Sequence, residues 1–92
     1  MIRYTKPTAQ GYLAEDPEAA IARLGVLEDR LEAVEVQLHQ ALEQMAALSQ
    51  AGKTKTATYR QFFAQKLSCL DCLGRMGISV SQGENRFSRE TK

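Results

Sequence analysis

The chain has 92 residues, of which 43% are hydrophobic and 25% are charged. This length lies below the usual single-domain size of roughly 100 to 150 residues, so a multidomain enzyme is excluded. The composition is that of a folded protein and excludes a wholly disordered chain. The net charge of +1 provides no overall attraction to nucleic acid or to an anionic membrane.

The sequence carries no signal for export or membrane insertion. Its apolar runs are shorter than the roughly 20 residues that a membrane span requires, and the first residues lack the apolar core of a signal peptide. Two cysteines are too few for a disulfide scaffold, which suits a reducing compartment. We therefore expect a cytoplasmic protein with no membrane partner.

Residues 1–15 are predicted to form an extended arm. Pro7, Gly11 and several small polar residues disfavour a helix in this segment. Tyr4 and Tyr12 provide aromatic side chains with which the arm can dock.

A long helix is predicted over residues 16–50. Asp16 suits the N-cap position, Pro17 the first helical position, and Glu18 the positive end of the helix dipole. The segment that follows is rich in alanine, leucine and glutamate, which favour a helix. Gly52 provides a left-handed stop after it.

Apolar residues recur along this helix at alternating spacings of three and four, a heptad seam over about four heptads. They are Leu24, Leu27, Leu31, Val34, Leu38, Ala41, Met45 and Leu48. Ile21 and Leu42 widen the apolar stripe, which indicates contact with more than one neighbour.

A second helix is predicted over about residues 58–76. Thr58 and Gln61 match a capping box, with Thr54 and Thr56 as competing N-caps. Gly77 marks its end, and residues 78–92 are predicted to form a polar tail. The apolar set with helical spacing is Tyr59, Phe62, Phe63, Leu67, Leu70, Leu73 and Met76.

These elements predict an all-α fold, an antiparallel helical hairpin spanning residues 16–77. The first helix, of about 34 residues, is roughly 50 Å long, whereas the second, of about 19, is roughly 28 Å long. The shorter helix leaves part of the seam uncovered: Ile21, Leu24, Leu27 and Leu31. We therefore expect a homo-oligomeric bundle held through Leu24, Leu27 and Leu31. Alternatively, the arm folds back and covers these residues through Tyr4, Tyr12 and Leu13.

Charge is distributed unevenly between the two helices. Residues 16–50 carry a net charge of −5 and residues 51–77 a net charge of +4. One interpretation is that the helices attract each other through exposed ion pairs, each contributing about 0.2 to 1 kcal/mol. The other is that the basic segment binds an anion.

The candidate ligand site is the start of the second helix. Free backbone amides there point outward with the positive end of the helix dipole, a combination that suits a phosphate group. Cations and hydroxyl groups add to this attraction for phosphate, and the Tyr59 ring can stack on a base. The candidate ligand-binding residues are Lys53, Thr54, Lys55, Thr56, Thr58, Tyr59 and Arg60.

No catalytic or metal site is predicted. The segment Gly52-Lys53-Thr54 lacks the earlier glycine and the preceding strand of a P-loop. Cys69 and Cys72 form a C-x-x-C motif in mid-helix, so we interpret them as structural side chains. His39 is the only histidine and has no companions for a zinc site or a catalytic triad. We expect no enzymatic activity, cofactor or metal.

The segment GKTKTATYRQFFAQKL, from Gly52 to Leu67, followed by Gly77-Ile78, resembles the second half of small helical-hairpin proteins of phages and prophages of Gram-positive bacteria. Phage proteins of this size include nucleotide sponges that inhibit Thoeris and CBASS defence, and anti-CRISPR proteins. The resemblance implies a counter-defence or phage accessory role in the host cytoplasm. It assigns no ligand residues.

Three functions are compatible with the sequence. The first is a sponge that sequesters a phosphorylated nucleotide, such as a cyclic nucleotide or an ADP-ribose-type signal, at the basic helix start. The second is an inhibitor that presents its acidic helix to a host protein target. The third is a structural coiled-coil adaptor. The sequence favours the first only slightly.

Overall fold

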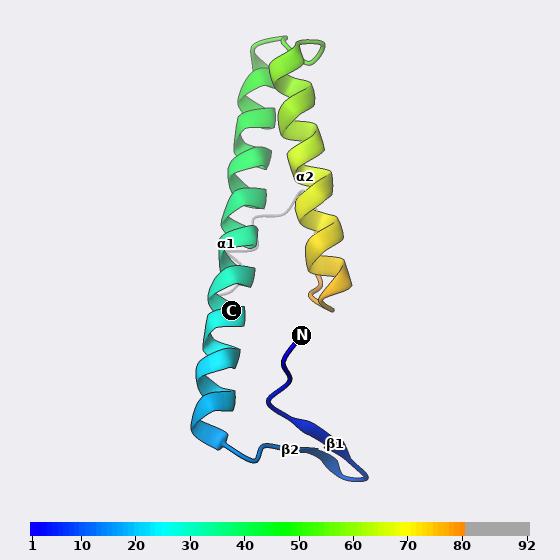
Figure 1. The fold of residues 1–92 in the computed structure, drawn as a ribbon. Helices are drawn as coiled ribbons and strands as arrows, with labels where there is room; N and C mark the ends of the chain where they lie inside the picture. Colours follow the sequence, from blue (N-terminus) through cyan, green and yellow to red (C-terminus); the bar gives the residue numbers. More distant parts are fainter. Residues whose placement is uncertain (81–92) are drawn as a thin grey trace, which may run out of the picture. The chain divides into compact units, whose positions relative to one another are not determined.

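The computed structural model describes residues 1–80. Two short strands, β1 (Lys6–Thr8) and β2 (Gly11–Leu13), precede two helices, α1 (Pro17–Gln50) and α2 (Ala57–Arg75) (Figure 1). The chain divides into a unit of residues 1–31 and a unit that begins at Glu32. The predicted helical hairpin is therefore confirmed as the main element, but the all-α prediction missed a small sheet.

The N-terminal arm is a β-hairpin rather than a plain extended segment. Strands β1 and β2 pair antiparallel, with Lys6 opposite Leu13 and Thr8 opposite Gly11. The backbone N–H of Gln10 donates to the Thr8 hydroxyl across the turn at 3.3 Å. The turn residues Ala9 and Gln10 have none of the usual hairpin chemistry, which is why the sequence pattern did not reveal this turn.

The ends of α1 are those that the sequence predicts. The Asp16 carboxylate accepts the backbone N–H of Ala19 at 3.1 Å and so caps the helix start. After the last turn, Gly52 adopts a φ of 72°, and the N–H of Lys53 donates to the carbonyl of Leu48 at 2.8 Å. This arrangement is a Schellman stop, which satisfies a carbonyl that the helix leaves without a partner.

The start of α2 differs from the favoured prediction, because Thr56 and not Thr58 is the N-cap. The Thr56 hydroxyl accepts the backbone N–H of Tyr59 at 3.2 Å and donates to the carbonyl of Lys53 at 2.9 Å. One side chain thus joins the preceding turn to the first turn of the helix. Thr58 lies inside that first helical turn, where its hydroxyl has no capping role.

A second Schellman stop ends α2. Gly77 has a φ of 79°, and the N–H of Ile78 donates to the carbonyl of Leu73 at 2.8 Å. Residues 78–80 form no helix or strand, and the rest of the predicted tail, residues 81–92, lies outside the described residues.

The core of the second unit lies between α2 and the part of α1 that begins at Glu32, which run side by side in opposite directions (Figure 1). Its buried side chains are Leu38, Ala41 and Met45 from α1, and Cys69 and Leu73 from α2. The side-chain amide of Gln65 also donates to the carbonyl of Gln37 at 3.3 Å, so a polar contact joins the two helices.

The apolar set predicted for α2 is only partly buried. Leu73 is fully buried, whereas Phe63, Leu67 and Met76 are exposed. A single neighbouring helix covers a narrow face, so a wide apolar stripe leaves its outer members in solvent. Cys69, absent from the predicted set, takes a central position in the core.

Candidate functional site

The predicted ligand-binding residues form an exposed basic turn, defined here as residues 52–60. Lys53, Lys55 and Arg60 are exposed, as are Thr54 and Thr58. Thr56 and Tyr59 are half-buried. The structure thus places the three cations on one short stretch of chain, at the start of α2.

Some donors of this turn already have partners within the chain. The Thr56 hydroxyl donates to the carbonyl of Lys53 at 2.9 Å, and Nη1 of Arg60 donates to the carbonyl of Lys55 at 3.4 Å. Within the described residues, the backbone amides of Ala57 and Thr58 have no protein acceptor. These two amides and the cations are the groups that the turn offers to an anion.

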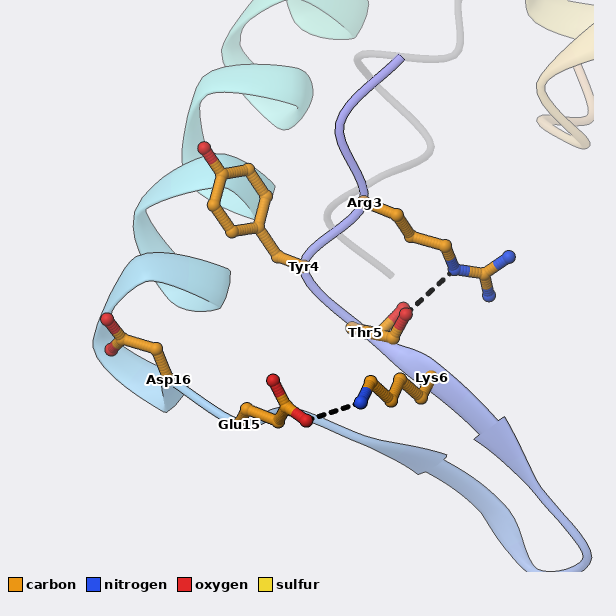
Figure 2. Close-up of a pocket in the computed structure, with 6 residues that line it drawn as sticks. All are labelled: Arg3, Tyr4, Thr5, Lys6, Glu15 and Asp16. Carbon is orange, nitrogen blue, oxygen red and sulfur yellow. Dashed lines mark hydrogen bonds and ion pairs between the residues drawn. The ribbon is translucent and has the colours of Figure 1, made fainter.

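A pocket that the sequence did not predict lies in the first unit. It has a volume of about 120 Å³ and is open to solvent. Its lining residues are Arg3, Tyr4, Thr5, Lys6, Glu15 and Asp16 (Figure 2). The β-hairpin brings together residues from the two ends of the arm, a proximity that no local sequence pattern signals.

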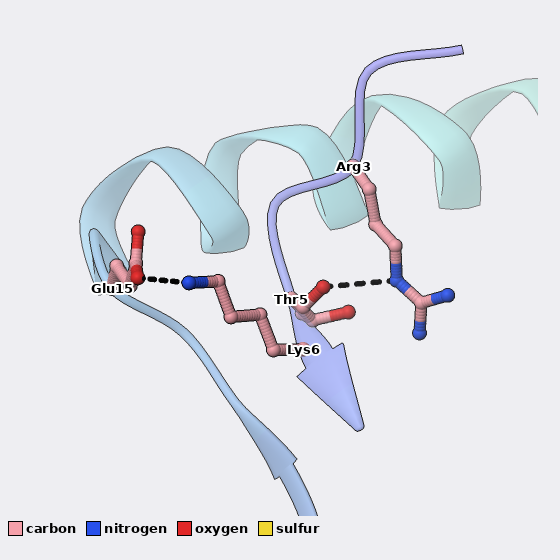
Figure 3. A network of polar contacts seen from close by, with 4 residues as sticks. All are labelled: Arg3, Thr5, Lys6 and Glu15. Atoms are coloured by element: carbon pink, nitrogen blue, oxygen red, sulfur yellow. Dashed lines mark hydrogen bonds and ion pairs between the residues drawn. The ribbon is translucent and has the colours of Figure 1, made fainter. Parts of the chain in front are cut away.

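The charged groups of this pocket have partners within the chain. Lys6 forms an ion pair with Glu15, and Nε of Arg3 donates to the carbonyl of Thr5 at 2.9 Å (Figure 3). Asp16 caps α1. The network therefore links the hairpin to the start of α1, and we assign it a structural role.

Cation–π contacts also order the first unit. The Arg23 guanidinium lies 5.4 Å from the centre of the Tyr4 ring, and that of Arg3 lies 5.9 Å from the Tyr12 ring. Tyr4 therefore joins the arm to α1 at Arg23, whereas the alternative interpretation of the arm expected it to cover the apolar residues Ile21, Leu24, Leu27 and Leu31. The other two residues of that alternative, Tyr12 and Leu13, remain exposed.

The arm leaves an apolar surface on α1 uncovered. We name it the leucine strip and define it as Ile21, Leu24, Leu27 and Leu31. The exposed fractions are 70% for Ile21, 54% for Leu24 and 37% for Leu27, and Leu31 is half-buried. Within the described residues, the strip is therefore an exposed apolar surface on one face of α1.

The cysteines and the histidine show no metal-binding geometry. Burial raises the pKa of the Cys69 thiol, with a further contribution from Cys72, which is half-buried. Nε2 of His39 lies 3.1 Å from a carboxylate oxygen of Glu43, one turn along α1. The described part of the chain contains no group of three histidine, cysteine or acidic side chains placed to hold a metal ion.

Comparisons with protein-family models, with curated proteins and with solved structures find no match to this chain. No helix within residues 1–80 has the length and apolar character needed to cross a membrane.

Proposed function

We propose that this chain is a non-enzymatic binding protein, a helical hairpin that self-associates through the leucine strip. The observation that carries the proposal is the exposure of Leu24 and Leu27, which continue the heptad seam whose later members, Leu38 and Met45, are buried by α2. The same apolar pattern that binds a helix within the chain thus remains available to a helix of another chain.

Covering the strip favours association. At about 2 kcal/mol for a fully buried apolar side chain, covering the exposed parts of Ile21, Leu24 and Leu27 in both copies contributes roughly 6 kcal/mol. Lost translational and rotational freedom opposes this contribution by about 4 kcal/mol or more. Association through the strip is therefore expected to be weak and reversible.

A pair of matched substitutions tests this proposal. Leu27→Glu places a charge within the strip, and Val26→Glu places the same charge on the same helix at an exposed position outside it. Sedimentation velocity is expected to show a monomeric Leu27→Glu variant and an associating Val26→Glu variant. Equal association of the two variants would exclude the strip as the interface.

The basic turn supports a second candidate function, the binding and sequestration of a phosphorylated nucleotide. The supporting observation is that Lys53 and Lys55 are exposed near the amides of Ala57 and Thr58, which have no protein acceptor in the described residues. Cations and helix-start amides together attract phosphate. The resemblance to phage hairpin proteins suggests a cyclic nucleotide or an ADP-ribose-type signal as the ligand, and a counter-defence role.

Calorimetric titration tests this second function with cyclic dinucleotides, cyclic trinucleotides and cyclic ADP-ribose isomers. A charge-assisted contact contributes roughly 1.5 to 3 kcal/mol, so Lys55→Ala or Arg60→Ala is expected to weaken binding about tenfold to a hundredfold. Lys66→Ala is the control, because Lys66 lies over the Phe63 ring further along α2. Absence of binding by the wild type, or equal binding by all variants, would exclude the turn as a nucleotide site.

A further inference from the structure

Charged residues flank the leucine strip in an ordered way. Leu24 and Leu31 occupy a positions of the heptad and Leu27 a d position. This register places Arg23 at g and Glu28 at e, the two positions that border a coiled-coil core. The sequence repeats the order one heptad later, with Arg30 at g and Glu35 at e. A basic edge and an acidic edge therefore border the strip.

Arg23 and Glu28 have no opposite charge within reach on their own helix. Ion pairs along a helix join residues three or four apart, and those neighbours of Arg23 and Glu28 include no opposite charge. The ion pairs of residues 1–80 include those of Lys6 with Glu15, His39 with Glu43 and Asp71 with Arg75. Neither Arg23 nor Glu28 belongs to any of them.

The arm holds the Arg23 side chain at the edge of the strip. The Tyr4 ring lies 5.4 Å from its guanidinium, which retains its charge and its N–H donors. Leu24, the next residue, remains 54% exposed beside it. The contact therefore orders the basic edge and leaves the apolar surface accessible.

Helix orientation determines which edges meet in a pair of these strips. In a parallel coiled coil in register, a g residue faces the e residue that lies five positions later on the other helix. Arg23 of one copy therefore meets Glu28 of the second copy, and by symmetry Glu28 of the first copy meets Arg23 of the second. In an antiparallel pair, g faces g and e faces e, which brings like charges together. Opposite charges favour the parallel arrangement and like charges disfavour the antiparallel one.

We propose that the partner of the leucine strip is a second copy of this chain, paired parallel and in register, with Arg23 of each copy bound to Glu28 of the other. This inference rests on the proposed self-association and adds to it the orientation of the copies and the two charged contacts.

Charge reversal in the full chain tests the proposal, with sedimentation equilibrium at low and at high salt as the measurement. Glu28→Arg converts two attractive contacts into repulsive ones and is expected to weaken association about tenfold at low salt, and less at high salt. The double variant Arg23→Glu with Glu28→Arg restores opposite charges and is expected to return association toward the wild-type value. Asp29→Arg is the control, because it makes the same charge reversal at the f position, on the outer face of the helix.

Association of Glu28→Arg equal to that of wild type would overturn the parallel pairing, as would a double variant no stronger than Glu28→Arg. Either result leaves self-association through the leucine strip intact, provided that the wild type and Asp29→Arg associate. A wild type that remains monomeric would instead overturn both proposals.

Discussion

Thr56 holds together the turn that reverses the chain between α1 and α2. Its hydroxyl accepts the N–H of Tyr59 and donates to the carbonyl of Lys53, so it fixes the helix start and the turn together. We predict that Thr56→Ala lowers the free energy of unfolding by about 1 kcal/mol. Urea denaturation at a fixed protein concentration measures this change.

Thr58→Ala is the matched control for that measurement, because Thr58 lies in the same helical turn without a capping bond. It is expected to change the free energy of unfolding by less than about 0.5 kcal/mol. A larger loss for Thr58→Ala than for Thr56→Ala would show that the cap has been assigned to the wrong threonine.

The two cysteines differ in burial and therefore in expected reactivity. Cys69 lies in the helix interface, where burial raises the pKa of its thiol, whereas Cys72 is half-buried. Alkylation proceeds through the thiolate, so we predict that iodoacetamide modifies Cys72 first. Peptide mass spectrometry at successive times distinguishes the two sites, and equal rates would contradict the buried position of Cys69.

The raised pKa of Cys69 also predicts a pH dependence of stability. The unfolded chain releases the thiol proton at a lower pH than the native chain does, so the unfolded state binds fewer protons in the alkaline range. The free energy of unfolding therefore falls as the pH rises above the ordinary thiol range. Cys69→Ala is expected to make this fall less steep, and an unchanged slope in urea denaturation at several pH values would refute the prediction.

At the scale of elements, the hairpin interface depends on a few side chains. Leu73 of α2 is fully buried, whereas Leu67 of the same helix is 50% exposed. We predict that Leu73→Ala costs about 2 to 5 kcal/mol, since it opens a cavity in a small core. Leu67→Ala is expected to have a much smaller effect. Thermal melts followed by circular dichroism compare the stabilities of the two variants, and similar losses of stability would contradict the assigned helix face.

The helices were more predictable than the arm because their signals are local. Asp16, Gly52 and Gly77 act through bonds to residues a few positions away, and all three have the predicted roles. The β-hairpin instead brings together residues further apart in the sequence, since Lys6 pairs with Leu13 across the strands and forms an ion pair with Glu15. Its Ala-Gln turn carries no recognisable signature.

The sequence did not select the right N-cap among its three candidates, for a related reason: Thr56, a competing candidate, is the cap, and not the favoured Thr58. Thr54, Thr56 and Thr58 all suit an N-cap by residue type. The choice of Thr56 depends on the additional bond to the Lys53 carbonyl, which exists only once the turn has folded. At the basic turn, the sequence identified the exposed cations correctly, but it did not indicate that Thr56 and part of Arg60 are engaged within the chain.

At the scale of the whole molecule, the leucine strip is an apolar surface that stays exposed within residues 1–80. A chain of this size buries a small core, and association with further copies is a common way for small proteins to bury more apolar surface. In this account the first half of α1 provides the interface between copies. The basic turn follows the end of α1, so the two proposed functions use different residues.

Sedimentation equilibrium of the wild-type chain tests self-association most directly. Across concentrations from about 10 µM to about 1 mM, we predict a reversible rise in average mass. The mass is expected to rise from that of the 10.2 kDa chain to at least that of a dimer. A mass of 10.2 kDa at every concentration would contradict the account, because the leucine strip would then remain exposed to solvent without a partner copy.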